Sequence, residues 1–119
     1  MNATDRRRSL QILERDHWPD QAEYPSPMVQ RCHALRKFPV GELTVEDLRL
    51  LIGQDIGLPF LMPLALEIVR KDPLAEGDLY PGDLLRNMLH APDSYWVDHP
   101  DQRSELQELA RPVLHALPK

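Results

Sequence analysis

The sequence has few of the features that bring a protein out of the cytoplasm or into a membrane. Its one cysteine, Cys32, excludes an internal disulfide and fits a reducing compartment. The longest apolar run, residues 56–66, is broken by Pro59 and Pro63, and a membrane span needs about 20 residues. The N-terminus is polar, and no apolar segment of a signal peptide follows its three arginines. We therefore expect a cytoplasmic protein with no membrane span.

Catalytic and metal-binding patterns are also missing. The five histidines show no HxxxH spacing, a CxxC pair is impossible with one cysteine, and there is no GxSxG, GxGxxG or P-loop motif. We expect no enzyme activity, no cofactor and no metal. A small enzyme that uses Asp98 and His99 in a cleft is kept as an alternative. The net charge of −5 argues against nucleic-acid binding, which requires a basic surface.

What the sequence does have is helical periodicity interrupted by proline and glycine. Twelve prolines in 119 residues are scattered along the chain, which predicts short helices joined by rigid corners. We expect an all-α fold of about six short helices in one domain, residues 1–119, with residues 1–25 as a partly ordered N-terminal arm. Trp18 and Tyr24 are predicted to attach the proline-rich loop 16–27 to the core.

The helix starts and ends follow from capping residues. The first predicted elements are a short helix within residues 1–16 capped by Thr4, a helix from Ser26-Pro27 to Lys37, and a helix from Thr44 to about Gly53, where Thr44 forms a capping box with Asp47. A helix from Pro59 or Pro63 to Lys71 and one from Pro81 to Leu89 follow. The last elements are a helical turn after Pro92 and a helix from Pro100 that Pro112 bends or splits.

Charge is unevenly distributed along the chain. Residues 72–101 hold seven acids and one base, Arg86. Some of these acids stand at predicted helix starts, where they offset the helix dipole, and that alone explains part of the pattern. The other interpretation is a protein-binding surface in which acids surround aromatic residues. Trp96 is either part of that surface or a residue of the core.

Residues 31–85 also resemble a known family. The runs GELTVEDLRLLIGQ, GLPFLMPLALE and DPLAEGDLYPGDLL are similar to immunity proteins of bacterial contact-dependent growth inhibition (CDI) systems. The resemblance implies a non-enzymatic protein that binds and neutralises the C-terminal toxin domain, often a nuclease, of a large exoprotein. It identifies no individual binding residues.

Charge and resemblance together suggest a toxin-binding surface. An acidic protein suits a basic toxin cleft, and electrostatic attraction speeds association. We expect a monomer that binds with nanomolar or lower dissociation constant, about −12 kcal/mol. A helical adaptor or regulatory protein with an unrelated basic partner remains the alternative function. The predicted toxin-binding residues are Glu76, Asp78, Tyr80, Asp93, Trp96, Asp98 and Asp101.

Overall fold

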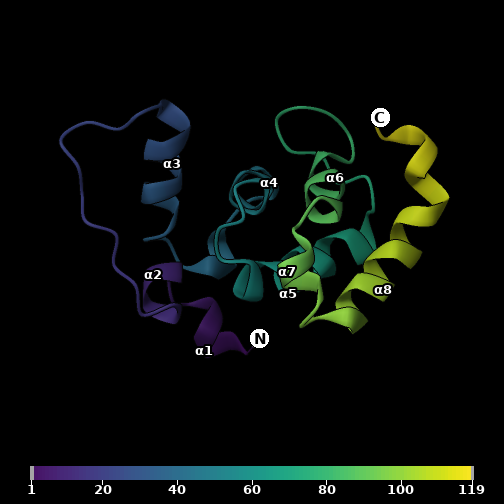
Figure 1. The fold of residues 1–119 in the computed structure, drawn as a ribbon, viewed down its shortest axis with the longest axis horizontal. Helices are drawn as coiled ribbons and strands as arrows, with labels where there is room; N and C mark the ends of the chain where they lie inside the picture. Colours follow the sequence, from purple (N-terminus) through teal and green to yellow (C-terminus); the bar gives the residue numbers. More distant parts are fainter. Residues whose placement is uncertain (1, 119) are drawn as a thin grey trace. The chain divides into compact units, whose positions relative to one another are not determined.

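The computed structural model describes residues 2–118 and divides the chain into two compact units, up to Thr44 and from Val45 onward. Every regular element among the described residues is helical, which confirms the all-α prediction (Figure 1). The single-domain organisation stays a prediction, and each unit is described by itself. The elements are α1 (Ala3–Arg6), α2 (Leu10–Leu13), α3 (Pro27–Leu35), the 3-10 helix η1 (Val40–Glu42), α4 (Val45–Gly53), α5 (Leu58–Lys71), α6 (Asp83–Leu89), α7 (Asp93–Trp96), α8 (Pro100–Ala110) and the 3-10 helix η2 (Arg111–Ala116).

The N-terminal residues form two one-turn helices, so the predicted single helix capped by Thr4 is wrong. Asn2 caps α1 through a hydrogen bond from the Asp5 amide, and Ser9 caps α2 through one from the Ile12 amide. The first unit also closes on itself by backbone bonds, because the Val40 amide donates to the Arg8 carbonyl oxygen at 2.9 Å. Because Asn2 and Ser9 each cap a helix start, this segment forms two short helices instead of one.

Helix α3 begins as the sequence predicts. The Ser26 hydroxyl accepts a hydrogen bond from the Val29 amide, and Pro27 occupies the first helical position. The helix ends at Leu35, two residues before the predicted end at Lys37. The rings of Trp18 and Tyr24 lie 5.0 and 4.8 Å from the His33 ring and so attach loop 16–27 to this helix. The sequence predicted attachment to the core, but His33 is half-buried.

The second unit is built on α5, which packs against α4, α6 and α8 (Figure 1). Each of these helices buries an apolar stripe, and burying one large apolar side chain contributes roughly 1.5–3 kcal/mol. The fully buried residues of this core include Leu51, Ile52, Leu61, Met62, Ala65, Val69, Leu84, Leu85, Met88 and Leu106. The core therefore fixes α5, α6 and α8, which are the helices next to the segments that carry the predicted site.

Glycines and prolines set the helix boundaries in this unit. Gly57 and Gly82 precede α5 and α6 with φ of 67° and 87°, a region that favours glycine. Helix α6 therefore begins at Asp83, and the predicted start at Pro81 is two residues early. Helix α5 begins at Leu58 and runs past Pro63, while α8 gives way to η2 next to Pro112. The predicted split at Pro112 is confirmed.

None of the helices in residues 2–118 is long and apolar enough to cross a membrane.

Candidate functional site

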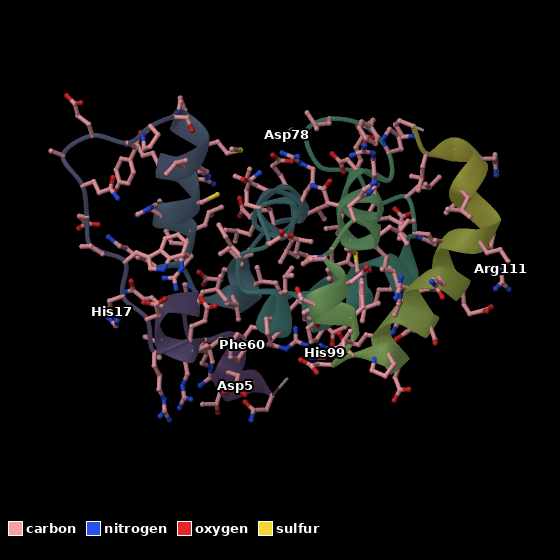
Figure 2. The ribbon with its side chains drawn as sticks, in the orientation of Figure 1. Asp5, His17, Phe60, Asp78, His99 and Arg111 are labelled. Carbon is pink, nitrogen blue, oxygen red and sulfur yellow. The ribbon has the colours of Figure 1, made fainter. Side chains whose placement is uncertain are left out.

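The seven predicted toxin-binding residues fall into two groups, one at each end of α6. Glu76, Asp78 and Tyr80 lie in the loop between α5 and α6, residues 72–82, called the acidic loop below. The other four come from α7 to the start of α8. Figure 2 shows this separation, with Asp78 on the acidic loop and His99 near the second group. A helix of seven residues is about 10 Å long, so α6 lies between the two groups along the chain and sets them about that far apart.

The acidic loop folds around the buried carboxylate of Asp83. Its Oδ1 accepts a hydrogen bond from the Gly77 amide at 2.7 Å, and its Oδ2 accepts one from the Leu79 amide at 3.0 Å. The Tyr80 amide also points at Oδ2, at 3.5 Å. Asp83 is only 1% exposed, so water does not compete for these bonds. A carboxylate at the first residue of α6 therefore holds the loop that precedes the helix.

Two residues of α4 complete this arrangement. Glu46 Oε1 accepts from the Asp78 amide at 2.9 Å and from Arg49 Nε at 2.6 Å, while the second guanidinium donor reaches Glu46 Oε2 at 2.6 Å. Arg49 Nε also lies 3.8 Å from Asp83 Oδ2, so the guanidinium is placed between two carboxylates. The hydrogen bond from Arg49 lowers the pKa of Glu46. Glu46 is therefore ionised at neutral pH and accepts from the loop as a carboxylate.

A side chain at Gly77 would force the two neighbouring carboxylates to shift. A Cβ there would lie 2.6 Å from Glu46 Oε1 and 3.0 Å from Asp83 Oδ2. The amides of residues 77 and 78 can reach the two carboxylates only because the backbone approaches them this closely. Asn87 adds a further link, since its Nδ2 donates to the Arg49 carbonyl oxygen at 2.8 Å.

The outer side of the acidic loop presents charged, apolar and aromatic groups together. Glu76 and Asp78 are exposed, Tyr80 is half-buried, and Leu79 is 63% exposed. Sequence reasoning missed Leu79 and the parts played by Asp83, Glu46 and Arg49. The signal for a tight turn was present in the Gly77, Pro81 and Gly82 positions, but the partners in α4 lie more than 30 residues away.

The second group consists of three exposed acids around a buried aromatic pair. Asp93, Asp98 and Asp101 are exposed, whereas Trp96 is 4% exposed and lies edge-on to the Tyr95 ring at 5.1 Å. Burial raises the pKa of the Tyr95 hydroxyl to about 12, and this hydroxyl donates to Gln102 Oε1 at 2.6 Å. The burial of Trp96 supports the alternative that it belongs to the core, and it offers a partner little area.

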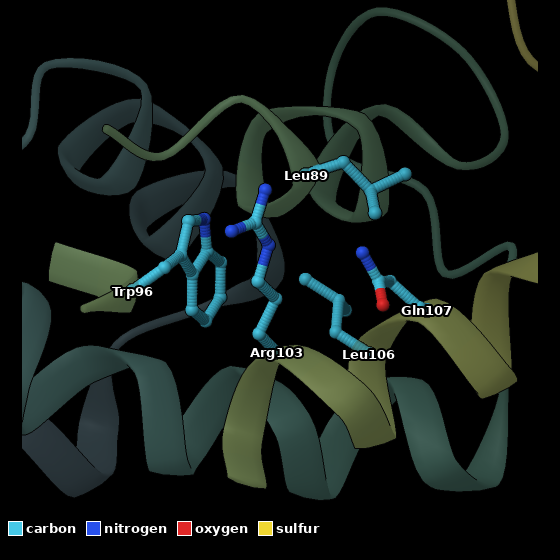
Figure 3. Close-up of a pocket in the computed structure, with 5 residues that line it drawn as sticks. All are labelled: Leu89, Trp96, Arg103, Leu106 and Gln107. Carbon is cyan, nitrogen blue, oxygen red and sulfur yellow. The ribbon is translucent and has the colours of Figure 1, made fainter. Parts of the chain in front are cut away.

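A small pocket lies beside Trp96. It is lined by Leu89, Trp96, Arg103, Leu106 and Gln107, and Figure 3 shows the indole and the Arg103 guanidinium extending into it. Its volume of about 60 Å³ is well below the several hundred Å³ that a small-molecule ligand requires.

His99, the residue of the enzyme alternative, is not among the residues that line this pocket. Its ring stacks on Tyr95 with centroids 4.1 Å apart, and its Nδ1 lies 2.9 Å from the Tyr95 carbonyl oxygen. Within residues 2–118, no three or more His, Cys, Asp or Glu side chains are grouped so that they could hold a metal ion.

The fold and this surface define a small all-α protein with an acidic loop whose backbone is held by two carboxylates. A family model described as CDI immunity proteins matches residues 12–106, and the chain belongs to this family. Membership implies a toxin-neutralising function through binding of a cognate toxin protein, and the family is generally non-enzymatic. Neither a curated protein nor a solved structure matches the chain.

Proposed function

We propose that this chain binds the C-terminal toxin domain of a CDI exoprotein, that the domain is a nuclease, and that binding blocks its action on nucleic acid. The family match carries the toxin-binding part of the proposal. The charge of the second unit supports the nuclease part. Nucleases present basic surfaces to phosphate, and a protein that covers such a surface needs negative charge.

The structure keeps most of that negative charge on the surface. Of the seven acids in residues 72–101, Asp83 is buried and the other six are exposed, while the single base, Arg86, is half-buried. Such a surface attracts a basic partner at long range and repels nucleic acid. We expect association to slow as salt concentration rises, because charges separated by more than the Debye length, about 8 Å at 0.15 M, are screened.

We also propose that the chain acts as a monomer and in the cytoplasm. We expect one copy to bind one toxin domain, in the cytoplasm that the delivered toxin enters. A lethal partner requires a dissociation constant of nanomolar or below, which corresponds to about −12 kcal/mol.

The experiment that tests the function is co-expression of this chain with the toxin domain encoded directly upstream of it. We expect cells that make both proteins to grow, cells that make only the toxin domain to stop, and the two proteins to purify as a one-to-one complex. An unrelated CDI toxin domain serves as the specificity control, and growth should not be restored with it. A folded chain that neither restores growth nor co-purifies with the domain would leave the adaptor alternative as the better account.

The nuclease component has its own assay. The purified toxin domain should degrade DNA or RNA, and an equimolar amount of this chain should stop the degradation. A toxin domain with no activity on either polymer, but still neutralised by the chain, would contradict the nuclease component alone.

A further inference from the structure

We infer that Leu79 is the anchor by which the acidic loop recognises its toxin, inserting into an apolar pocket that is bordered by lysine or arginine on the toxin surface. This inference rests on the proposed function and identifies the contact that it uses.

Leu79 is held outward by its own backbone. Its amide and the amide of Gly77 donate to the Asp83 carboxylate, and the neighbouring Asp78 amide donates to Glu46. Three consecutive residues are thus tied to side chains that are buried or half-buried. The Leu79 side chain remains 63% exposed in spite of this. A partner that covers it does not have to order the loop first, and preorganisation of this kind strengthens binding.

Among the described residues of this unit, two other large apolar side chains are exposed and can be compared with Leu79. Val97 is 77% exposed after α7, and Leu114 is 54% exposed in η2. Single exposed apolar residues are common and need no function. Leu79 differs from both because carboxylates accept hydrogen bonds from its own amide and from the amides of the two residues before it. Tyr80, Glu76 and Asp78 also lie in the same loop.

The chemistry around Leu79 selects the kind of partner. Glu76 and Asp78 are exposed, so a surface that covers Leu79 also meets two negative charges. A cationic surface gains from that meeting. A second copy of this chain packed symmetrically through the same loop would place like charges against one another. The toxin domain with a basic surface therefore fits the loop better than a second copy does.

Apolar and charged residues should affect different rate constants. Losing the Leu79 side chain removes a contact that forms late and holds the complex, so Leu79→Ala should mainly increase the dissociation rate. The double variant Glu76→Gln, Asp78→Asn should mainly lower the association rate and weaken its dependence on salt.

The test is surface plasmon resonance with the purified toxin domain that is encoded directly upstream. We expect Leu79→Ala to weaken binding at least tenfold, which is about 1.4 kcal/mol. Leu79→Met should retain most of the affinity, because methionine has similar volume. The matched control is Leu114→Ala, which removes an equally large exposed side chain and should change affinity less than twofold. Circular dichroism establishes that each variant is folded.

The outcomes separate this inference from the function on which it rests. If the wild-type chain does not bind the toxin domain, the proposed function fails, and the inference fails with it. If the wild-type chain binds and Leu79→Ala binds equally well, the function stands and Leu79 is not the anchor. Equal losses for Leu79→Ala and Leu114→Ala would also overturn the inference, since neither loss would then be specific to the acidic loop.

Discussion

The protein holds its two long loops by different means. In the first unit, loop 16–27 is held by side chains, with Trp18 and Tyr24 against the His33 ring and the Arg36 guanidinium 4.0 Å above the Trp18 ring. In the second unit, the acidic loop is held by its backbone, through amides that donate to Asp83 and Glu46. Ring contacts leave the backbone between them free to vary, whereas hydrogen bonds to consecutive amides fix the path of the chain.

This difference matters because only the second mode fixes the direction of the neighbouring side chains. Loop 16–27 has one charged anchor for its backbone, since both terminal nitrogens of Arg36 donate to the Asp16 carbonyl oxygen at 3.0 Å. The acidic loop has anchors at residues 77, 78 and 79 in succession. A loop that recognises one partner at nanomolar affinity benefits from the second arrangement.

The largest expected effect comes from removing the Asp83 carboxylate, around which the acidic loop folds. Asp83→Ala leaves the amides of Gly77 and Leu79 without their acceptor and removes a negative charge beside Arg49. We expect the free energy of unfolding to fall by about 2–4 kcal/mol in urea denaturation. Asp93→Ala is the matched control, because Asp93 also opens a helix but is exposed. Equal stability of Asp83→Ala and the wild-type chain would show that the carboxylate does not hold the loop.

A smaller effect is expected from the ring contacts of the first unit. Trp18→Ala removes the surface on which Arg36 and His33 pack, at a cost of about 1–2 kcal/mol. Hydrogen exchange should become faster at amides of residues 16–27 and remain unchanged in the acidic loop. Faster exchange in the acidic loop as well would contradict the view that each loop is held by its own contacts.

The contribution of Glu46 should depend on pH. Arg49 lowers the pKa of Glu46 in the folded chain, so the carboxylate stabilises the fold above its ordinary pKa of 4.5, and this contribution is lost as pH falls through the lowered value. Glu46→Gln should therefore be less stable than the wild-type chain by about 1 kcal/mol at pH 7. The difference should shrink steadily below pH 4.5. A constant difference from pH 7 to pH 3 would argue against the charged form as the acceptor.

The smallest effect is expected at an exposed ion pair of the first unit. A hydrogen bond from Lys37 lowers the pKa of Asp20, but both side chains are exposed. Asp20→Asn should leave the unfolding midpoint unchanged in 0.15 M salt, because exposed ion pairs contribute little. A clear loss of stability that salt abolishes would show that this pair helps to hold loop 16–27.

Sequence reasoning identified those features that depend on residues close together in the chain. The Ser26 cap, the helical turn after Pro92 and the break at Pro112 all follow from local chemistry, and all are present. The attachment of Trp18 was also predictable, because few residues in that loop are apolar. Asn2 and Ser9 were overlooked as caps because Thr4 is also a capping residue and lies between them.

The candidate site was predictable only in part. Acid counts pointed to Glu76 and Asp78, and the structure leaves both exposed. The contacts that hold the loop were not predictable, since Asp83 and Asp78 differ in burial although both are acids in the same short run. Which of the two turns inward is decided by Arg49 and Glu46, which come from α4. Tertiary contacts of this kind leave no periodic signal in the sequence.

The most direct test of the claim that the acidic loop meets the toxin is methyl NMR of this chain during titration with the toxin domain. The Leu79 methyl signals should shift or broaden most, and the Leu114 methyl signals should stay in place. The Gly77 and Leu79 amides should keep their hydrogen bonds to Asp83. Unchanged Leu79 methyl signals in a complex that does form, with the changes centred on other residues, would contradict the claim.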